Sequence, residues 1–348
     1  MNGIVVHGLG AVSPAGWGVA ALRDALAAGA PLPTQPIARP GWQRPLHICP
    51  APPPPSRPPF LAHARLRRAG VMSQHIVAAA LEALGGDTAR VQSGALRLGI
   101  VVCMMAGCVT YSRRFFEETL QNPVTASPLL FPETVFNAPA SHLAALLNST
   151  AANYTLVGDE GVLLQGLAVA ADWLAQDQAE ACIIVGAEEL DWIVADALRL
   201  FQRGAVHSDG AGALYLKRGA PESGRGVELA RVTDSFPFTA VQSRHDAAEA
   251  MRAQLSASAA GELLYCSALP GTASHAAEQS AWRDWSAPHR APKTILGEAF
   301  AASAAWQCVL ACDAIQRGEF AAANVSVVGT NEQAIGTRFV LRESEHHP

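Results

Sequence analysis

The stretch TLVGDEGV (residues 155–162), followed by the apolar run 163–174, decides the fold of this chain. It predicts a strand, a sharp turn that contains the two glycines, and a buried helix. Enzymes of the α/β class place a nucleophile at such a turn, because the N-terminus of the following helix stabilises an anion. Gly158 has no side chain to offer there, and Asp159 and Glu160 are more typical of residues that cap a helix. We therefore predict the frame of a catalytic site without its nucleophile.

The composition limits the possible partners. Of the 348 residues, 50% are hydrophobic and 16% are charged, against about 25% charged residues in typical soluble proteins. These values predict a large core and an extensive interface with another subunit. A formal net charge of −5 without a basic block argues against nucleic acid and against an anionic membrane as the main partner. No apolar run approaches the roughly 20 residues of a membrane span, so we expect no such span.

The cysteines and the first residues predict a cytoplasmic location. The seven cysteines show no C-x-x-C spacing and most of them lie in apolar runs, as expected of buried, reduced thiols. The opening MNGIVVHG lacks the basic region and the long apolar run of a signal peptide.

The chain repeats one plan of secondary structure. The first copy predicts a strand, an apolar helix and a strand that enters an acidic loop, at residues 154–157, 161–175 and 181–189. The second copy predicts the same order at residues 293–296, 300–315 and 325–332. A helix that is apolar on all sides is typical of the middle layer of a large core. The same order found twice indicates an internal duplication.

The beginnings of the two copies also correspond. Each predicts a strand, a turn and a helix, with strand and helix at 3–10 and 19–28 in the first copy and at 227–234 and 246–256 in the second. We predict an α/β fold in which two duplicated βαβαβ-type halves, residues 1–222 and 223–348, pack as five alternating layers of helix and sheet. The proline-rich segment 50–59 within the first half predicts an extended surface crossing rather than a strip for partner recognition.

Three segments, in order along the chain, carry a resemblance to a known family. VVHGLGAVSP (residues 5–14) resembles the strand and turn V-x-G-x-G-x-V-[ST]-P, FNAPASHL (136–143) resembles N-x-x-A-[GS]-H-[LV], and SDGAGAL (208–214) resembles G-[ED]-G-A-G-[AV]-[LV]. With these motifs the chain resembles the β-ketoacyl synthase family over almost its whole length. The resemblance implies a thiolase-like fold.

The resemblance also implies that the catalytic residues are missing. β-Ketoacyl synthases condense acyl groups with decarboxylation, using a Cys that carries the acyl group as a thioester and two His that polarise the carbonyl group and stabilise the enolate. The Cys of T-A-C-x-S-G-V falls on Gly158, the His of H-G-T on Pro270, and the His of K-x-x-x-G-H on Glu298. Of these motif residues only Lys293, the Lys of K-x-x-x-G-H, is retained, so we expect no catalytic residue. His275, five residues after Pro270, is an alternative for the first His.

A ketosynthase-like chain without these residues is similar to the chain-length factors of aromatic-polyketide and polyene pathways. The similarity implies a catalytically silent subunit that forms a heterodimer with an active β-ketoacyl synthase and shapes its acyl tunnel in polyketide, polyene or fatty-acid-type biosynthesis. It also implies that the partner handles the phosphopantetheine-borne substrate of an acyl carrier protein, and that this chain binds no cofactor and no metal.

The apolar stretch 98–105 is the expected interface element, although it would also suit a central core strand. The residues expected at the interface or in the tunnel wall are Met104, Met105, Gly107, Thr110 and Phe136. His142 and His207 are expected to be structural.

Two other functions stay open. Glu298 with Asp159 or Glu160 would form an acid and base pair for the hydrolysis or decarboxylation of a thioester. Glu298 would more simply cap the helix at 300–315, with Lys293 as its counter-charge. The other function is that of a scaffold that docks an acidic acyl carrier protein. Its candidate arginines are Arg65, Arg67, Arg68, Arg113 and Arg114.

Overall fold

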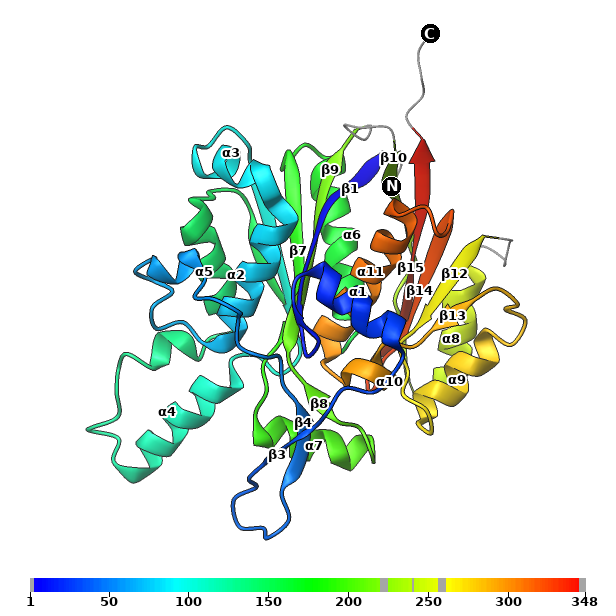
Figure 1. Ribbon diagram of the computed structural model, residues 1–348. Helices are drawn as coiled ribbons and strands as arrows, with labels where there is room; N and C mark the ends of the chain where they lie inside the picture. The colour runs from blue at the N-terminus through cyan, green and yellow to red at the C-terminus, as the bar shows by residue number, and fades with distance from the viewer. Residues whose placement is uncertain (1–2, 220–224, 240, 256–260, 344–348) are drawn as a thin grey trace.

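The structure, a computed structural model that describes residues 3–219, 225–239, 241–255 and 261–343, contains the same five-stranded arrangement twice (Figure 1). In the first half the strand order is β6 (Asn153–Val157), β5 (Leu98–Met104), β7 (Ala181–Glu188), β9 (Gly210–Arg218) and β1 (Ile4–Ser13). In the second half it is β13 (His289–Arg290), β12 (Glu262–Cys266), β14 (Ala322–Val328), β15 (Gln333–Glu343) and β10 (Arg225–Val232). The first three strands of each order are parallel, and each of the last two is antiparallel to its neighbours. β1 pairs with β10 and joins the halves, so the predicted duplication is confirmed.

Five alternating layers of helix and sheet follow from this arrangement, as predicted. The central layer consists of α6 (Val162–Ala175) and α11 (Phe300–Gln316), which contact strands of both halves. α2 (Val71–Leu84) and α5 (Ala138–Leu147) cover the outer face of the first half, and α8 (Arg244–Ala253) and α9 (Ala273–Ala281) cover that of the second (Figure 1). Every residue of α11 before its last is buried, which explains why its sequence is apolar on almost all sides.

The remaining elements lie at the edges of these layers. They are α1 (Val19–Ala28), α3 (Thr88–Gln92), α4 (Val109–Gln121), α7 (Trp192–Phe201), α10 (Lys293–Leu296), the 3-10 helices η1 (Pro59–Ala62), η2 (Gly85–Asp87) and η3 (Phe131–Glu133), and the short strands β2 (Gly16–Trp17) and β11 (Phe236–Pro237). A separate small sheet consists of β3 (Gln35–Ile37), β4 (Leu46–Cys49) and β8 (His207–Ser208). The proline-rich segment before η1 is neither helix nor strand, as a surface crossing requires. In the described part of the chain, no helix combines the length and the apolar character needed to cross a bilayer.

One predicted strand is wrong. Residues 293–296 form the single-turn helix α10, because Pro292 has helical φ and ψ angles of −57° and −29° before it and Gly297, with a φ of 83°, ends it. The strand of the second half that corresponds to β6 is β13. The expected boundary between residues 222 and 223 and the expected helix end at residue 256 lie outside the described residues.

Candidate functional site

The turn between β6 and α6 has little room for a nucleophile. Gly158 donates its N–H to the carbonyl oxygen of Met104 at 3.2 Å, which fixes the turn beside the end of β5. A Cβ atom at Gly158 would lie 3.2 Å from the Cβ atom of Val162 and 3.3 Å from a carboxylate oxygen of Glu332. A cysteine at this position would therefore require its neighbours to move.

Asp159 connects this turn to the loop between β14 and β15. Its Oδ1 accepts the N–H of Gly161 at 3.1 Å, and its Oδ2 accepts the N–H of Glu332 at 3.0 Å. Asp159 is fully buried, and burial raises the pKa of its carboxyl group. These contacts give Asp159 a structural role, since it satisfies backbone N–H groups at the start of α6 and in the facing loop.

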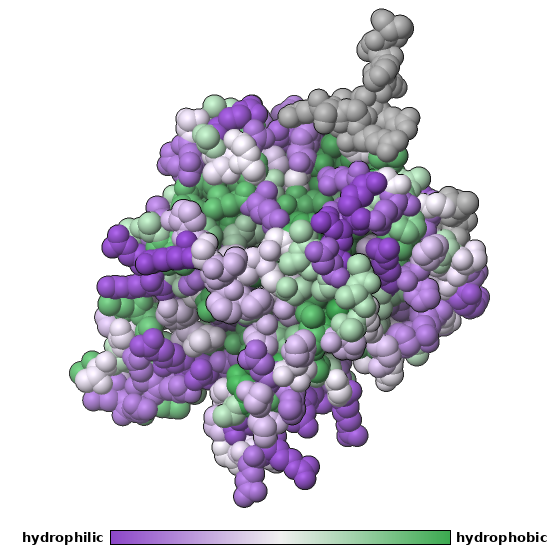
Figure 2. Space-filling model, viewed as in Figure 1, coloured by the Kyte–Doolittle hydropathy of each residue, from purple (hydrophilic) through white to green (hydrophobic). Residues whose placement is uncertain are grey.

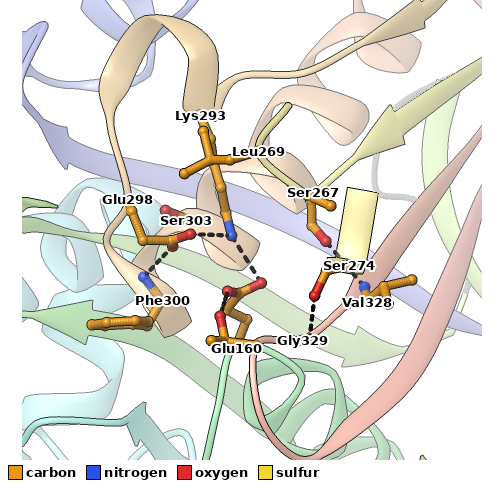
Figure 3. Close-up of polar contacts among 12 residues, drawn as sticks. Glu160, Ser267, Leu269, Ser274, Lys293, Glu298, Phe300, Ser303, Val328 and Gly329 are labelled. Carbon is orange, nitrogen blue, oxygen red and sulfur yellow. Dashed lines mark hydrogen bonds and ion pairs between the residues drawn. The ribbon is translucent and has the colours of Figure 1, made fainter. Parts of the chain in front are cut away.

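Glu160 from the first half meets Lys293 and Glu298 from the second half in the core (Figure 3). The Nζ atom of Lys293 lies 2.8 Å from Oε2 of Glu160 and 2.7 Å from Oε2 of Glu298. None of the three residues is more than 4% exposed. Glu298 also accepts the N–H of Phe300 at 2.9 Å, and Glu160 accepts the hydroxyl of Thr330 at 3.0 Å. We call Glu160, Lys293 and Glu298 the buried charge cluster.

The sequence predicted part of the buried charge cluster. Glu298 does bind the start of α11 and does pair with Lys293, as expected. The contact between Glu160 and Lys293 was missed, although a lysine retained in an apolar segment was itself a signal, because a buried ammonium group requires partners. Of the two acids considered as partners of Glu298, the structure brings Glu160 to the cluster and places Asp159 against the loop after β14.

Burial and neighbouring charges shift the pKa values of Glu160 and Lys293. Burial and then the charge of Glu298 raise the pKa of Glu160 to about 8, although Lys293 opposes this effect. Burial disfavours the charge of Lys293, but the two carboxyl groups outweigh it and raise the pKa of Lys293. At neutral pH Glu160 therefore keeps its proton beside the charged Lys293.

Glu298 also supports a strained residue. Phe300, the first residue of α11, has a φ of 42°, in the left-handed region that costs a bulky residue about 1–3 kcal/mol. The N–H of Phe300 donates to Glu298 (Figure 3). The N–H of Ala299 donates to Oγ of Ser303 at 2.8 Å, and the two bonds hold this turn. The carboxylate is thus part of the framework of the helix start.

Pro270, at the position of the first His, shares a cavity wall with Lys293. The cavity has a volume of about 300 Å³ and we call it the Lys293 cavity. Two serines hold the Pro270 loop against the end of β14 (Figure 3). Oγ of Ser267 accepts the N–H of Val328 at 3.1 Å. Oγ of Ser274 donates to the carbonyl oxygen of Gly329 at 2.8 Å. The ring of Pro270 has no donor or acceptor, so it cannot polarise a carbonyl group in the cavity.

The three histidines considered in the sequence do not replace the missing ones. His142 is buried and lies 2.9 Å from the carboxylate of Glu133. His207 is buried with Nδ1 3.1 Å from the carbonyl oxygen of Glu298, and burial lowers its pKa. His275 lines a cavity other than the Lys293 cavity. The first two are structural, as predicted, and the third does not face Lys293.

The expected interface stretch 98–105 contains a core strand. β5 is hydrogen-bonded to β6 on one side and to β7 on the other, and all seven of its residues, Met104 included, are buried. It is the central core strand that the sequence also allowed. Gly107 is buried as well, and a Cβ atom on it would lie 2.2 Å from the ring of Phe136. Gly107 therefore lies against the ring of Phe136.

Two buried glutamates, one at the end of β7 and one directly after it, hold the segment that leads into α4. Glu188 accepts the N–H groups of Met105 and Ala106, the latter at 3.1 Å, and Glu189 accepts the N–H of Thr110 at 2.6 Å. Burial raises the pKa of Glu188 to about 8 and that of Glu189 to about 7. The acidic loop predicted after this strand is thus a structural support for the segment that carries Met105 and Thr110.

Exposed apolar side chains lie on β6, on α4 and on the segment after α4, and sequence analysis identified only Phe136 among them as an interface candidate. β6 is the edge strand of its half. The exposed residues are Tyr154 and Val157 on β6, Phe116 and Leu120 on α4, and Val124, Leu129, Phe131, Val135 and Phe136 after it. We call these residues the apolar edge surface. Figure 2 shows apolar residues among polar ones at the lower left, where α4 projects.

The arginines expected to meet a carrier protein fall into two groups. Arg113 and Arg114 form ion pairs within the chain, with Asp191 at 2.9 Å and with Glu118 at 3.3 Å. The remaining three, Arg65, Arg67 and Arg68, are exposed. This second group forms no ion pair with a described residue at the distances found for Arg113 and Arg114, although the side chain of Arg114 is itself 61% exposed.

No family model matches the chain, and no curated protein matches it in sequence. Solved structures match over nearly the whole chain. The ishigamide ketosynthase/chain length factor has a TM-score of 0.78 at 20% identity, covering 98% of this chain and 99% of that one. The AntDE:AntF complex, a type II polyketide synthase acyl carrier protein with its ketosynthase bound to the hexaketide, has a TM-score of 0.76 at 16% identity, covering 97% and 98%. A β-ketoacyl synthase from Burkholderia phymatum STM815 has a TM-score of 0.75 at 17% identity, covering 99% and 100%.

The chain therefore has the thiolase-like fold of the β-ketoacyl synthases, as predicted, and resembles a ketosynthase/chain length factor in structure.

Proposed function

We propose that this chain is a catalytically silent, ketosynthase-like subunit that pairs with an active β-ketoacyl synthase and shapes its acyl tunnel. The buried charge cluster carries the proposal, because a lysine bound to two glutamates fills the place between the two helix starts. The three positions that would supply the thiolate and the two imidazoles hold Gly158, Pro270 and Glu298. Acyl transfer needs a nucleophile and a group that polarises the carbonyl, so this chain is not expected to perform it alone.

The similar solved structures support a biosynthetic setting. One is a ketosynthase/chain length factor, and another is a type II polyketide synthase ketosynthase with its acyl carrier protein. In our proposal the chain serves polyketide, polyene or fatty-acid-type biosynthesis, and its partner handles the phosphopantetheine-borne substrate, so the chain itself needs no cofactor. The seven free cysteines, six of them buried, suit the reducing cytoplasm.

The apolar edge surface supports the pairing. An edge strand offers unpaired N–H and C=O groups to a strand of another chain, and β6 ends the strand order of its half. Tyr154 and Val157 on β6 are each 53% exposed, and Leu120 on α4 is 70% exposed. Exposed apolar groups of this kind are typical of protein interfaces. We infer that the partner pairs with β6 and covers α4.

Met105 is the expected tunnel residue with the strongest structural support. It lines an apolar cavity of about 280 Å³ together with Ala197 and Phe201 of α7 and with Phe300. A larger side chain in this wall would shorten the space left for an acyl chain. Ala197→Phe should therefore shorten the product of the complex, whereas Ala27→Phe on the exposed side of α1 should leave product length unchanged.

The pairing is tested by co-expression with the active ketosynthase of the same pathway, followed by size-exclusion chromatography with light scattering. We expect a complex with one copy of each chain. Tyr154→Arg should dissociate it by placing a charge at the edge of β6. Val241→Arg, at a residue that is 94% exposed in the other half, is the matched control and should leave it intact. A wild-type chain that stays apart from the ketosynthase contradicts the proposal and favours a carrier-protein scaffold.

One observation favours a second function, the hydrolysis or decarboxylation of a thioester. With a pKa of about 8, Glu160 can exchange a proton near neutral pH, and its partner Lys293 lines the Lys293 cavity. Turnover of acyl and malonyl thioesters by the isolated chain distinguishes the two functions. Turnover that disappears in Glu160→Gln would establish the second function, and no turnover above the uncatalysed rate would exclude it.

A further inference from the structure

α4 lacks the packing that holds helices of similar length in this chain. None of its 13 residues is buried, whereas α2 and α6, with 14 residues each, bury nine. Among the helices and strands, α4 packs chiefly against η3, which follows it in the chain. α4 projects from the body of the molecule (Figure 1). Burial in the core therefore does not fix the direction of this helix.

Polar contacts hold the beginning of α4 instead. From the connection between β7 and α7, Glu189 accepts the N–H of Thr110 at 2.6 Å. Three residues further along α4, Nε of Arg113 lies 2.9 Å from Oδ2 of Asp191 in the same connection. The hydroxyl of Tyr111 donates to a carbonyl oxygen of the segment before α2 at 2.5 Å. The first contact fixes the point where α4 begins, and the contact with Asp191, about 4.5 Å further along the axis, fixes its direction.

Asp191 and Arg113 are each held in place by their own helix. Oδ1 of Asp191 accepts the N–H of Ile193 at 3.0 Å at the start of α7, and Asp191 is only 4% exposed. Arg113 forms a second ion pair at 2.9 Å, with Glu117 one turn further along α4. Charge-assisted hydrogen bonds of this kind are stronger than neutral ones. The ion pair thus joins two fixed side chains and ties α4 to α7.

The later part of α4 is bound to the segment that follows it. The ring centroids of Phe115 on α4 and Phe131 on η3 are 5.6 Å apart. Oε2 of Glu118 on α4 accepts the N–H of Ser127 at 3.0 Å. We call residues 109–136 the α4 arm. Seven of the nine residues of the apolar edge surface lie on it, so the direction of α4 decides where this surface is presented.

We infer that Asp191 is a positioning residue, which through Arg113 sets the direction of the α4 arm and so controls pairing with the ketosynthase. This inference rests on the proposed function, in which the partner covers α4. Because Asp191 is buried, it acts on the partner through α4 and not by contact. An arm that already has its bound direction loses less conformational entropy on binding. Loosening it should therefore weaken pairing even though the apolar edge surface is unchanged.

Hydrogen–deuterium exchange of the isolated full chain tests whether the ion pair holds α4. Asp191→Asn keeps an acceptor for the N–H of Ile193 but removes the charge, and Arg113→Met removes the other partner. We expect the amides of residues 109–121 to exchange at least about tenfold faster in both variants. The midpoint of urea unfolding should stay at the wild-type value, because α4 buries no residue. Arg114→Met, which breaks an ion pair inside α4, is the matched control and should exchange as wild type does.

Dissociation of the co-expressed complex with the active ketosynthase, followed by mass photometry after dilution, tests the consequence for pairing. We expect Asp191→Asn and Arg113→Met to raise the dissociation constant at least about tenfold and Arg114→Met to leave it unchanged. The inference is overturned if both variants exchange as wild type does, or if they pair as tightly as wild type despite faster exchange. A urea midpoint that falls together with the protection of α4 would assign Asp191 to the stability of the whole fold and would also overturn it. A wild-type chain that does not pair contradicts the proposed function instead, and exchange in the isolated chain still decides whether Asp191 holds α4.

Discussion

The starts of α6 and α11 occupy equivalent places in the two halves, and each brings a glutamate to Lys293. At α11, Glu298 is bound by the backbone N–H of Phe300 in addition to Lys293. At α6, Glu160 is bound by the side chains of Lys293 and Thr330. Burial and the charge of Glu298 raise the pKa of Glu160 to about 8. The two glutamates thus share one lysine but differ in their other hydrogen-bond partners.

By resemblance, the same two turns would hold the Cys and the second His of an active ketosynthase. Here the first turn holds Gly158, whose Cβ position is crowded by Val162, and the second holds Glu298 as part of the buried charge cluster. The comparison indicates that the chain has kept the two turns of the site and that the side chains between them stabilise the fold.

The largest effect is expected from removing the lysine that both glutamates share. Lys293→Met leaves two buried carboxyl groups without a cation, and breaking a buried ion pair costs about 3–5 kcal/mol. Urea unfolding followed by circular dichroism measures the loss. Arg114→Met, which breaks an exposed pair on α4, is the control and should cost about 0–1 kcal/mol. A loss below about 1 kcal/mol for Lys293→Met would show that the cluster does not stabilise the fold.

The two glutamates should differ when each is replaced by its amide. As a helix cap alone, Glu298→Gln would cost about 0.5–1 kcal/mol, but Glu298 is fully buried and paired with Lys293. We therefore expect a loss of about 1–3 kcal/mol at pH 7. Glu160→Gln replaces a protonated acid by a group of the same shape and should cost less than about 1 kcal/mol. The reverse order in urea unfolding would place the charge on Glu160.

The pH dependence of stability sharpens the same comparison. Between the ordinary glutamate pKa of 4.5 and its folded value of about 8, Glu160 binds a proton in the folded chain that the unfolded chain has lost. Stability therefore falls as pH rises through this window, by up to about 1.4 kcal/mol per pH unit for one proton. Glu188 and Glu189 act in the same direction.

Glu160→Gln should make this decline shallower. The stability of the variant relative to wild type should therefore be greater at pH 8–9 than at pH 5. Thermal unfolding across this range measures both slopes. Parallel slopes for wild type and Glu160→Gln would mean that Glu160 is ionised throughout the range.

The smallest effect concerns the first turn alone. Gly158→Cys restores the sulfur but leaves Pro270 and Glu298 in place, so incubation with an acyl thioester should give no acyl-protein by intact-mass spectrometry. An active ketosynthase treated in the same way is the positive control. A stoichiometric acyl adduct on the variant would mean that the turn alone still activates a thiol.

The layered fold was predictable because its signals are local and repeated. The apolar helix 300–315 and the strands around it follow from periodicity, and the predicted helix at 19–28 agrees with α1. The pattern of residues 293–296 predicts a strand because apolar residues suit either state, whereas the flanking Pro292 and Gly297 decide for a helical turn. The stretch 98–105 was ambiguous for a similar reason, since an apolar strand can be core or interface and only its pairing on both sides decides.

The sequence predicts which catalytic residues are missing from the site, but only some of the contacts among the residues that replace them. Gly158, Pro270 and Glu298 were identified by their places in motifs. The meeting of Glu160 with Lys293 depends on the packing of one half against the other, which no local pattern encodes. The exposed side chains of α4 were likewise missed, because an amphipathic helix with one apolar face is ordinarily packed against its own chain.

Product formation by the complex with an active ketosynthase, containing either wild-type chain or Glu160→Gln, tests most directly the central claim that this chain supplies no acid or base to acyl chemistry. Because the amide reproduces the shape of the protonated Glu160, the account predicts the same amount and the same length of product from both complexes. A Glu160→Gln chain that folds and pairs normally but yields little product would contradict the account and would assign the carboxyl group a catalytic role.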